Sequence, residues 1–142
     1  TVFLLDVIEH LEKEESLKLL RATEQIARQQ VIIFTPLGFL PQEHPDGKDH
    51  WGMEGGSWQT HKSGWLPEDF DDSWDIYAAR AYHTHDNLGS EFEKPYGAMW
   101  AIKNIKDTSR NGQIHIIGKR QKAHVMLDKM IDFVTGIYRN GK

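Results

Sequence analysis

The sequence contains no cysteine, and none of its apolar runs approaches the roughly 20 residues that a membrane-spanning helix needs. Without cysteine, a disulfide framework and a thiol nucleophile are both excluded. The first residues also lack the basic, apolar and small-residue order of a signal peptide. These absences predict a cytoplasmic protein without a membrane span.

The sequence also has little excess of charge of one sign. It contains 17 Lys and Arg and 21 Asp and Glu, which gives a net charge of −4. The charge is uneven: residues 118–142 are basic and residues 1–117 are acidic. A net acidic body makes a nucleic-acid partner improbable. At 142 residues the chain is long enough for one domain with a hydrophobic core.

The N-terminal third of the chain has the pattern of a βαβ unit. Residues 2–5 (VFLL) and 31–35 (VIIFT) are continuous apolar runs, which are typical of fully buried parallel strands, and Pro36 and Gly38 are expected to end the second run. Residues 14–28 between them have helical periodicity, with acids in the first turn. The two strands should therefore be parallel and joined by a right-handed crossover.

The sequence after the βαβ unit predicts an α/β chain whose later strands are antiparallel. In order, we expect a long irregular segment over 37–65, a short helix at 67–72, two antiparallel strands at 74–82 and 97–105, a short strand at 113–117 and an amphipathic helix at 123–138.

Three ionisable residues follow the first strand, in the stretch DVIEHL. Ligands of open α/β sheets bind at the carboxyl ends of the strands, and Asp6 lies at such an end. If residues 8–11 form a helical turn, Asp6, Glu9 and His10 can face one direction. The alternative is structural: Asp6 caps a turn, Glu9 is solvated and His10 bonds a backbone carbonyl.

Several segments, in this order, resemble class I S-adenosylmethionine (SAM)-dependent methyltransferases. They are FLLDVIEHLEKEESLKLLRATEQIARQQVIIFTP, QTHKSGWLPEDF, WDIYAARAY and KPYGAMWAIKNI. The resemblance implies a partial Rossmann-like fold, in which a parallel βαβ unit precedes an antiparallel strand pair and a C-terminal helix. It divides the chain into the C-terminal half of a methyltransferase-like domain (1–106) and a tail (107–142). FTPLGFLPQEHPDG and KPYGAMWAIKN look most like bacterial members found with surface-polysaccharide genes.

The family's cofactor fingerprint is a glycine-rich turn after its first strand, and GMEGG at 52–56 does not follow a strand as that turn would. We therefore expect this polypeptide to bind SAM weakly or not at all. We also expect the strand at 2–5 to have an exposed edge, through which the chain could self-associate.

The resemblance also implies roles for individual residues. Leu5, Asp6 and Val7 would line the cofactor pocket near the methionine part of SAM. His10 would lie nearer the methyl acceptor and act as a general base on a hydroxyl, since an imidazole pKa of about 6.5 suits that role. His61 lies in a segment that resembles the family's second histidine segment, and it is the other catalytic candidate.

Metal binding is left open by the same residues. D-x-x-E-H resembles the E-x-x-E-H pattern of metal-dependent O-methyltransferases, and Asp6, Glu9, His10 and His61 could hold a divalent ion. In that case His10 must lie close to the 59–65 segment. We expect this proximity, but no tightly bound ion.

Two weaker groups of candidates remain. His83 and His85 are spaced as a metal pair on one face of a strand, although a solvated strand end is the simpler interpretation. Trp51, Trp58 and Trp65 could stack on a sugar or a base, although the favoured interpretation is that they anchor the loop to the sheet.

The sequence thus predicts methyl transfer from SAM to a small-molecule or saccharide acceptor that it does not identify. The alternatives are a metal-dependent O-methyltransferase and a non-catalytic remnant that binds a carbohydrate or another protein.

Overall fold

A computed structural model describes residues 1–49, 51–106 and 111–117 of the chain. Its elements in chain order are β1 (Val2–Leu5), the 3-10 turn η1 (Ile8–His10), α1 (Lys13–Ile26), β2 (Gln30–Leu37), α2 (Gly56–Gln59), the 3-10 turn η2 (Pro67–Asp69), β3 (Trp74–His85), β4 (Glu91–Asn104) and β5 (Ile114–Ile117). The expected C-terminal helix at 123–138 lies outside the described residues.

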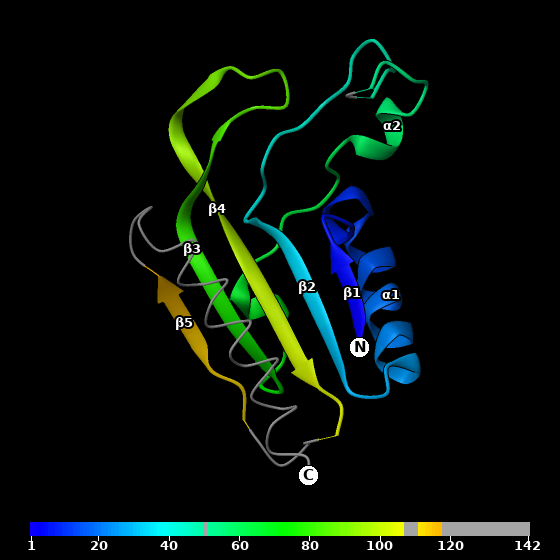
Figure 1. Ribbon diagram of the computed structural model, residues 1–142, viewed down its shortest axis with the longest axis vertical. Helices are drawn as coiled ribbons and strands as arrows, with labels where there is room; N and C mark the ends of the chain where they lie inside the picture. The colour runs from blue at the N-terminus through cyan, green and yellow to red at the C-terminus, as the bar shows by residue number, and fades with distance from the viewer. Residues whose placement is uncertain (50, 107–110, 118–142) are drawn as a thin grey trace.

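The five strands form one mixed sheet in the order β1-β2-β4-β3-β5 (Figure 1). β1 runs parallel to β2, with Val2 opposite Val31 and Leu5 opposite Phe34. β4 is antiparallel to both β2 and β3, and β5 adds to β3 in parallel. The parallel first pair, the antiparallel pair and the short last strand are therefore confirmed, and the α/β class with them.

The hydrophobic core lies on one face of this sheet. α1 joins β1 to β2 and packs Leu20 against that face, where Val31, Ile33, Met99 and Ala101 are all buried. Burial of its apolar stripe stabilises α1 as a helix, because tertiary packing contributes most of the stability of a helix this short. The helix ends at Ile26 and not at residue 28 as expected.

The prediction that residues 2–5 are fully buried is wrong. Phe3 is 55% exposed and Leu5 47% exposed, while Val2 and Leu4 pack against the core. β1 is an edge strand among the described strands, and α1 covers only one of its faces, so its apolar run is half in solvent. A continuous apolar run shows that a strand can be covered on both faces, but it does not identify what covers them.

Pro36 does not end β2, which continues to Leu37 and pairs Pro36 with Ala98. The carbonyl of Phe34 faces β1, where it accepts the Asp6 N–H, so the nitrogen of Pro36 faces the same side two residues later. β1 has already ended there, and the missing N–H therefore breaks no ladder bond.

The three tryptophans of the long loop divide into two kinds. Trp65 is fully buried and anchors the end of the loop, as favoured, whereas Trp51 and Trp58 are 72% and 73% exposed, which contradicts that interpretation for them. No helix in the described part of the chain is long and apolar enough to cross a membrane.

The one-sided core leads to a stability prediction. Ile33→Ala, at a fully buried position, should lower the free energy of unfolding by about 2–5 kcal/mol, because it leaves a cavity. Phe3→Ala, on the open face of β1, should cost about 1 kcal/mol or less. Urea unfolding of both variants measures the contrast, and equal losses would show that the β1 face is covered in solution.

Candidate functional site

The chain turns sharply after β1 and redirects its ionisable side chains. Asp6 has a φ of 49°, in the left-handed region that Asp tolerates better than most residues. Its N–H still donates to the carbonyl of Phe34 over 3.0 Å, so the parallel pairing continues one residue past β1. The expected helical turn follows as η1, which turns Glu9 inward and His10 toward a cavity.

The carbonyls of this turn are paired with a segment 50 residues later. The Glu9 carbonyl accepts the N–H groups of Lys62 and Ser63 over 2.7 and 3.1 Å. The Ile8 carbonyl accepts the hydroxyls of Ser16 and Ser63 over 2.7 and 3.1 Å. These bonds hold the loop that follows α2 against the carboxyl end of β1.

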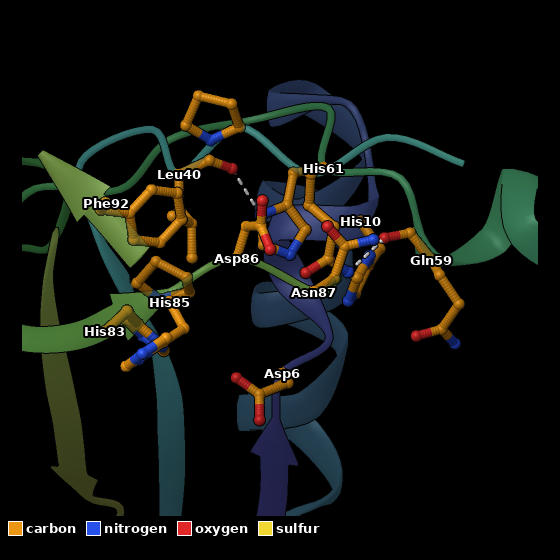
Figure 2. A pocket seen from close by; sticks show the side chains of 13 residues that line it. Asp6, His10, Leu40, Gln59, His61, His83, His85, Asp86, Asn87 and Phe92 are labelled. Atoms are coloured by element: carbon orange, nitrogen blue, oxygen red, sulfur yellow. Dashed lines mark hydrogen bonds between the residues drawn. The ribbon is translucent and has the colours of Figure 1, made fainter. Parts of the chain in front are cut away.

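The two catalytic candidates meet at this junction. The rings of His10 and His61 are in edge contact, with centroids 4.8 Å apart (Figure 2). Nδ1 of His10 lies 3.3 Å from the Thr60 carbonyl, and Nδ1 of His61 lies 2.7 Å from the Leu40 carbonyl. A carbonyl only accepts, so each Nδ1 carries the proton, and Nε2 of each neutral ring is left as an acceptor.

Burial keeps these rings neutral. It lowers the pKa of His61 to about 4, and the neighbouring His10, His83 and His44 lower it further by charge repulsion. Burial also lowers the pKa of His10 and the pKa of His83 below their ordinary values. At pH 7 the site therefore presents uncharged imidazoles.

Glu9 is the most unusual group of the site, because its side chain is charged by type but only 2% exposed. The Thr35 hydroxyl donates to its Oε2 over 3.0 Å, and Oε1 is buried with no donor from a neutral or basic group among the described residues. The Glu9 side chain also hydrogen-bonds that of Asp6 when one of the two carboxyls is protonated, and burial raises the pKa of Asp6 as well. Burial raises the pKa of Glu9 to about 7, and the nearby Asp6 carboxylate raises it further by repulsion. The alternative in which Glu9 is solvated is therefore wrong.

A cavity of about 350 Å³ opens beside these groups, past the ends of β1 and β2 (Figure 2). It is lined by Asp6, His10, Pro36, Leu40, Pro41, Gln42, Gln59, His61, His83, His85, Asp86, Asn87 and Phe92. This is the edge at which α/β sheets bind their ligands. The walls carry carboxylate, amide and imidazole groups, and in the described chain no Lys or Arg lines them.

Three residues form a group that could hold a cation. One ligand atom each from Glu9, His10 and His61 lies within 4.8 Å of the others. A carboxylate with two imidazoles suits zinc, manganese or iron, and the buried Oε1 of Glu9 is an oxygen that a cation would satisfy. Asp6, the fourth ligand of the metal hypothesis, is not part of this group.

The expected proximity of His10 to the 59–65 segment is confirmed by its contacts with Thr60 and His61. Of the three cofactor-binding candidates, only Asp6 lines the cavity. Leu5 is a half-exposed strand residue, and neither Leu5 nor Val7 is part of the lining. The structural alternative for His10, a bond to a backbone carbonyl, also holds, so its ring is fixed as well as accessible.

Sequence reasoning underestimated His83. The solvated strand end fits His85, which is exposed, but His83 is half-buried with its Nε2 enclosed, and both rings line the cavity opposite His10 and His61 (Figure 2). The alternating H-x-H spacing was the available signal, since it places both rings on one side of a strand.

Comparisons of the chain with protein-family models, with curated proteins and with solved structures found no match.

The raised pKa of Glu9 predicts how stability depends on pH. The folded state holds this proton up to about pH 7, whereas an unfolded Glu releases it near 4.5, so Glu9 lowers stability as the pH rises between these values. His61 opposes this trend, because its folded pKa of about 4 makes stability rise between pH 4 and 6.5.

One variant isolates the effect of Glu9. The unfolding free energy of Glu9→Gln, minus that of the wild type, should increase by about 3 kcal/mol at most from pH 4.5 to pH 8, because Gln does not ionise. Urea unfolding in EDTA at several pH values measures this difference. A difference that does not change with pH would show that Glu9 titrates normally.

Proposed function

We propose that this chain is part of a SAM-dependent methyltransferase that transfers a methyl group to a hydroxyl acceptor, with His10 as the general base. The observation that carries the proposal is the cavity at the carboxyl ends of β1 and β2, which two neutral imidazoles and the Asp6 carboxyl line together. The parallel β1–β2 pair followed by antiparallel strands is the arrangement that the resemblance implies.

The cavity suits a sulfonium cofactor electrostatically. Asp6 and Asp86 supply negative charge, and among the described lining residues there is no cation to oppose the positive sulfur. SAM, when bound, supplies the electrophilic methyl group, and the protein contributes alignment and a site with restricted water. Asp6, at the end of β1, is the residue best placed to hold the cofactor near its charged centre.

His10 has the properties of a base for a hydroxyl proton. The Thr60 carbonyl fixes the proton on Nδ1, so the lone pair of Nε2 is free to accept. The lowered pKa keeps the ring unprotonated at pH 7. His61 is a positioning residue: its edge contact with His10 and its bond to Leu40 hold the pair in one orientation.

Cofactor binding by the chain itself tests the proposal. We expect weak, saturable shifts of the amide NMR resonances of Leu5, Asp6 and Val7 on titration with SAM. Asp6→Asn should weaken binding about tenfold, because it removes a charge beside the sulfonium.

His10→Ala is the matched control, since a base for the acceptor should leave the affinity for SAM nearly unchanged while it reduces turnover. A different result would support the non-catalytic remnant instead of the methyltransferase. In that case SAM would not shift residues 5–7, and oligosaccharides would shift the exposed Trp51 and Trp58.

A second candidate, a metal-dependent O-methyltransferase, is favoured by the cluster of Glu9, His10 and His61. A divalent ion there would lower the pKa of an acceptor hydroxyl, and it would also hold Glu9 ionised. The Asp6 carboxyl beside the cluster adds negative charge that favours a cation.

Titration of EDTA-treated protein with Zn²⁺ and Mn²⁺ tests this candidate by calorimetry. If the site is built for a metal, His61→Ala and Glu9→Gln should each weaken binding at least about tenfold, since each removes one of three ligands. His115→Ala, on β5 and outside the cluster, is the control. Equal affinities in all four proteins would assign any bound ion to the surface.

A further inference from the structure

His83 approaches the cavity from β3, across from the pair of His10 and His61 (Figure 2). Between Ala79 and His83, β3 contains two more residues than the stretch of β4 that it faces, Ala98 to Tyr96. Such bulges redirect side chains and are frequent beside binding sites. The position of His83 on the cavity wall is therefore set by a specific irregularity of the sheet.

The Nε2 atom of His83 is buried and has no hydrogen-bond partner among the residues that the structure describes. An unpaired polar atom of this kind costs stability, and native proteins usually satisfy it with water or a ligand. His83 lines the cavity, so a rotation of its ring would bring Nε2 to a molecule bound there, which can then supply the partner. A hydroxyl satisfies Nε2 in either tautomer, since it both donates and accepts, whereas an ammonium group only donates.

The opposite wall of the cavity presents hydrogen-bond acceptors, which need donors from a ligand. His10 and His61 both have Nδ1 occupied by a backbone carbonyl, which leaves each Nε2 as an acceptor. Gln59 and Asn87 add amide groups to the lining, and Phe92 offers an apolar ring. Several hydroxyl groups on one small molecule would match this mixture of acceptors and amides.

Charge limits the ligand further. Asp6 and Asp86 line the cavity, and no Lys or Arg of the described chain does so. Lys62, whose charge helps to lower the pKa of His10, is exposed. A phosphate or carboxylate group would therefore meet negative charge without a counter-ion.

We propose that the cavity binds a neutral molecule with several hydroxyl groups, and that His83 is the specificity-determining residue that bonds one of them. This defines the acceptor class of the methyl transfer and rests on that proposed function only for the ligand's role as acceptor. The binding itself needs no cofactor, because every group named belongs to this chain.

Binding of small probes to the wild-type chain tests the proposal. The neutral probes are methyl α-glucoside, methyl α-galactoside and myo-inositol, the anionic probes are their monophosphate counterparts, and the cationic probes are glucosamine and galactosamine. Imidazole NMR resonances of His10, His61 and His83 report occupancy of the cavity. We expect at least one neutral probe to shift all three rings and to bind at least about tenfold more tightly than its phosphate.

Three outcomes would overturn the proposal. They are no shift by any neutral probe, an affinity for the phosphates equal to or above that for the neutral compounds, and tighter binding of the amines.

Two variants then isolate His83. His83→Phe keeps a planar ring but removes the hydrogen bond, and it should weaken the neutral probe at least about tenfold. His83→Gln places an amide nitrogen near the position of Nε2 and should stay within about threefold of the wild type. His115→Gln, a histidine of β5 that does not line the cavity, is the matched control. Retained affinity in His83→Phe would contradict the proposal. If the Phe variant does not fold, the affinity of His83→Gln decides, and a loss of more than about threefold would contradict the proposal.

The result is separable from that for methyl transfer. Neutral probes that bind while SAM does not would leave this inference standing and would withdraw the assignment of Asp6 as a cofactor-binding residue of this chain. SAM shifts at residues 5–7 without any probe binding would do the reverse.

Discussion

The site depends on the hydrogen bonds that the carbonyls of Ile8 and Glu9 accept from Ser16, Lys62 and Ser63. Ser16 is close in sequence, but both donors to the Glu9 carbonyl belong to the later loop, and buried carbonyls need partners, so the loop stabilises this turn. The loop depends equally on the turn, because most of its backbone up to Thr60 is in irregular structure. One junction thus fixes the carboxyl end of β1, the long loop and the contact between His10 and His61.

The base of the same loop is closed by Gly38 and Trp65, whose backbone groups bond each other over 2.7 and 3.4 Å. Gly38 has a φ of 79°, which favours glycine, and a Cβ on Gly64 would lie 2.7 Å from the nitrogen of Phe39. The buried Trp65 then fills the core beneath, and its indole N–H donates to Ser63. Glycine and tryptophan in this loop therefore have a structural reason that is independent of any ligand.

Much of the fold could be predicted from the sequence, because apolar runs and helical spacing report local burial. The parallel β1–β2 pair, α1, the antiparallel β3 and β4 and the turn after Asp6 all follow from such patterns. The open face of Phe3 and Leu5 did not, since a run of apolar residues does not state how many layers cover it. The H-x-H spacing places His83 and His85 on one side of β3, but the enclosed position of His83 also depends on a bulge between β3 and β4, which no spacing within one strand encodes.

Glu9 connects the structural and chemical sides of the site. A buried carboxyl beside a second carboxyl weakens a fold, and an apolar residue of similar size would remove that cost. Packing alone therefore gives no reason for a glutamate here, whereas a role with a proton or a cation does. Its neighbours fit both roles, because Asp6 raises its proton affinity and the imidazoles of His10 and His61 complete a set of cation ligands. The two roles exclude each other at one time, since a cation on Oε1 displaces the proton that burial would otherwise retain.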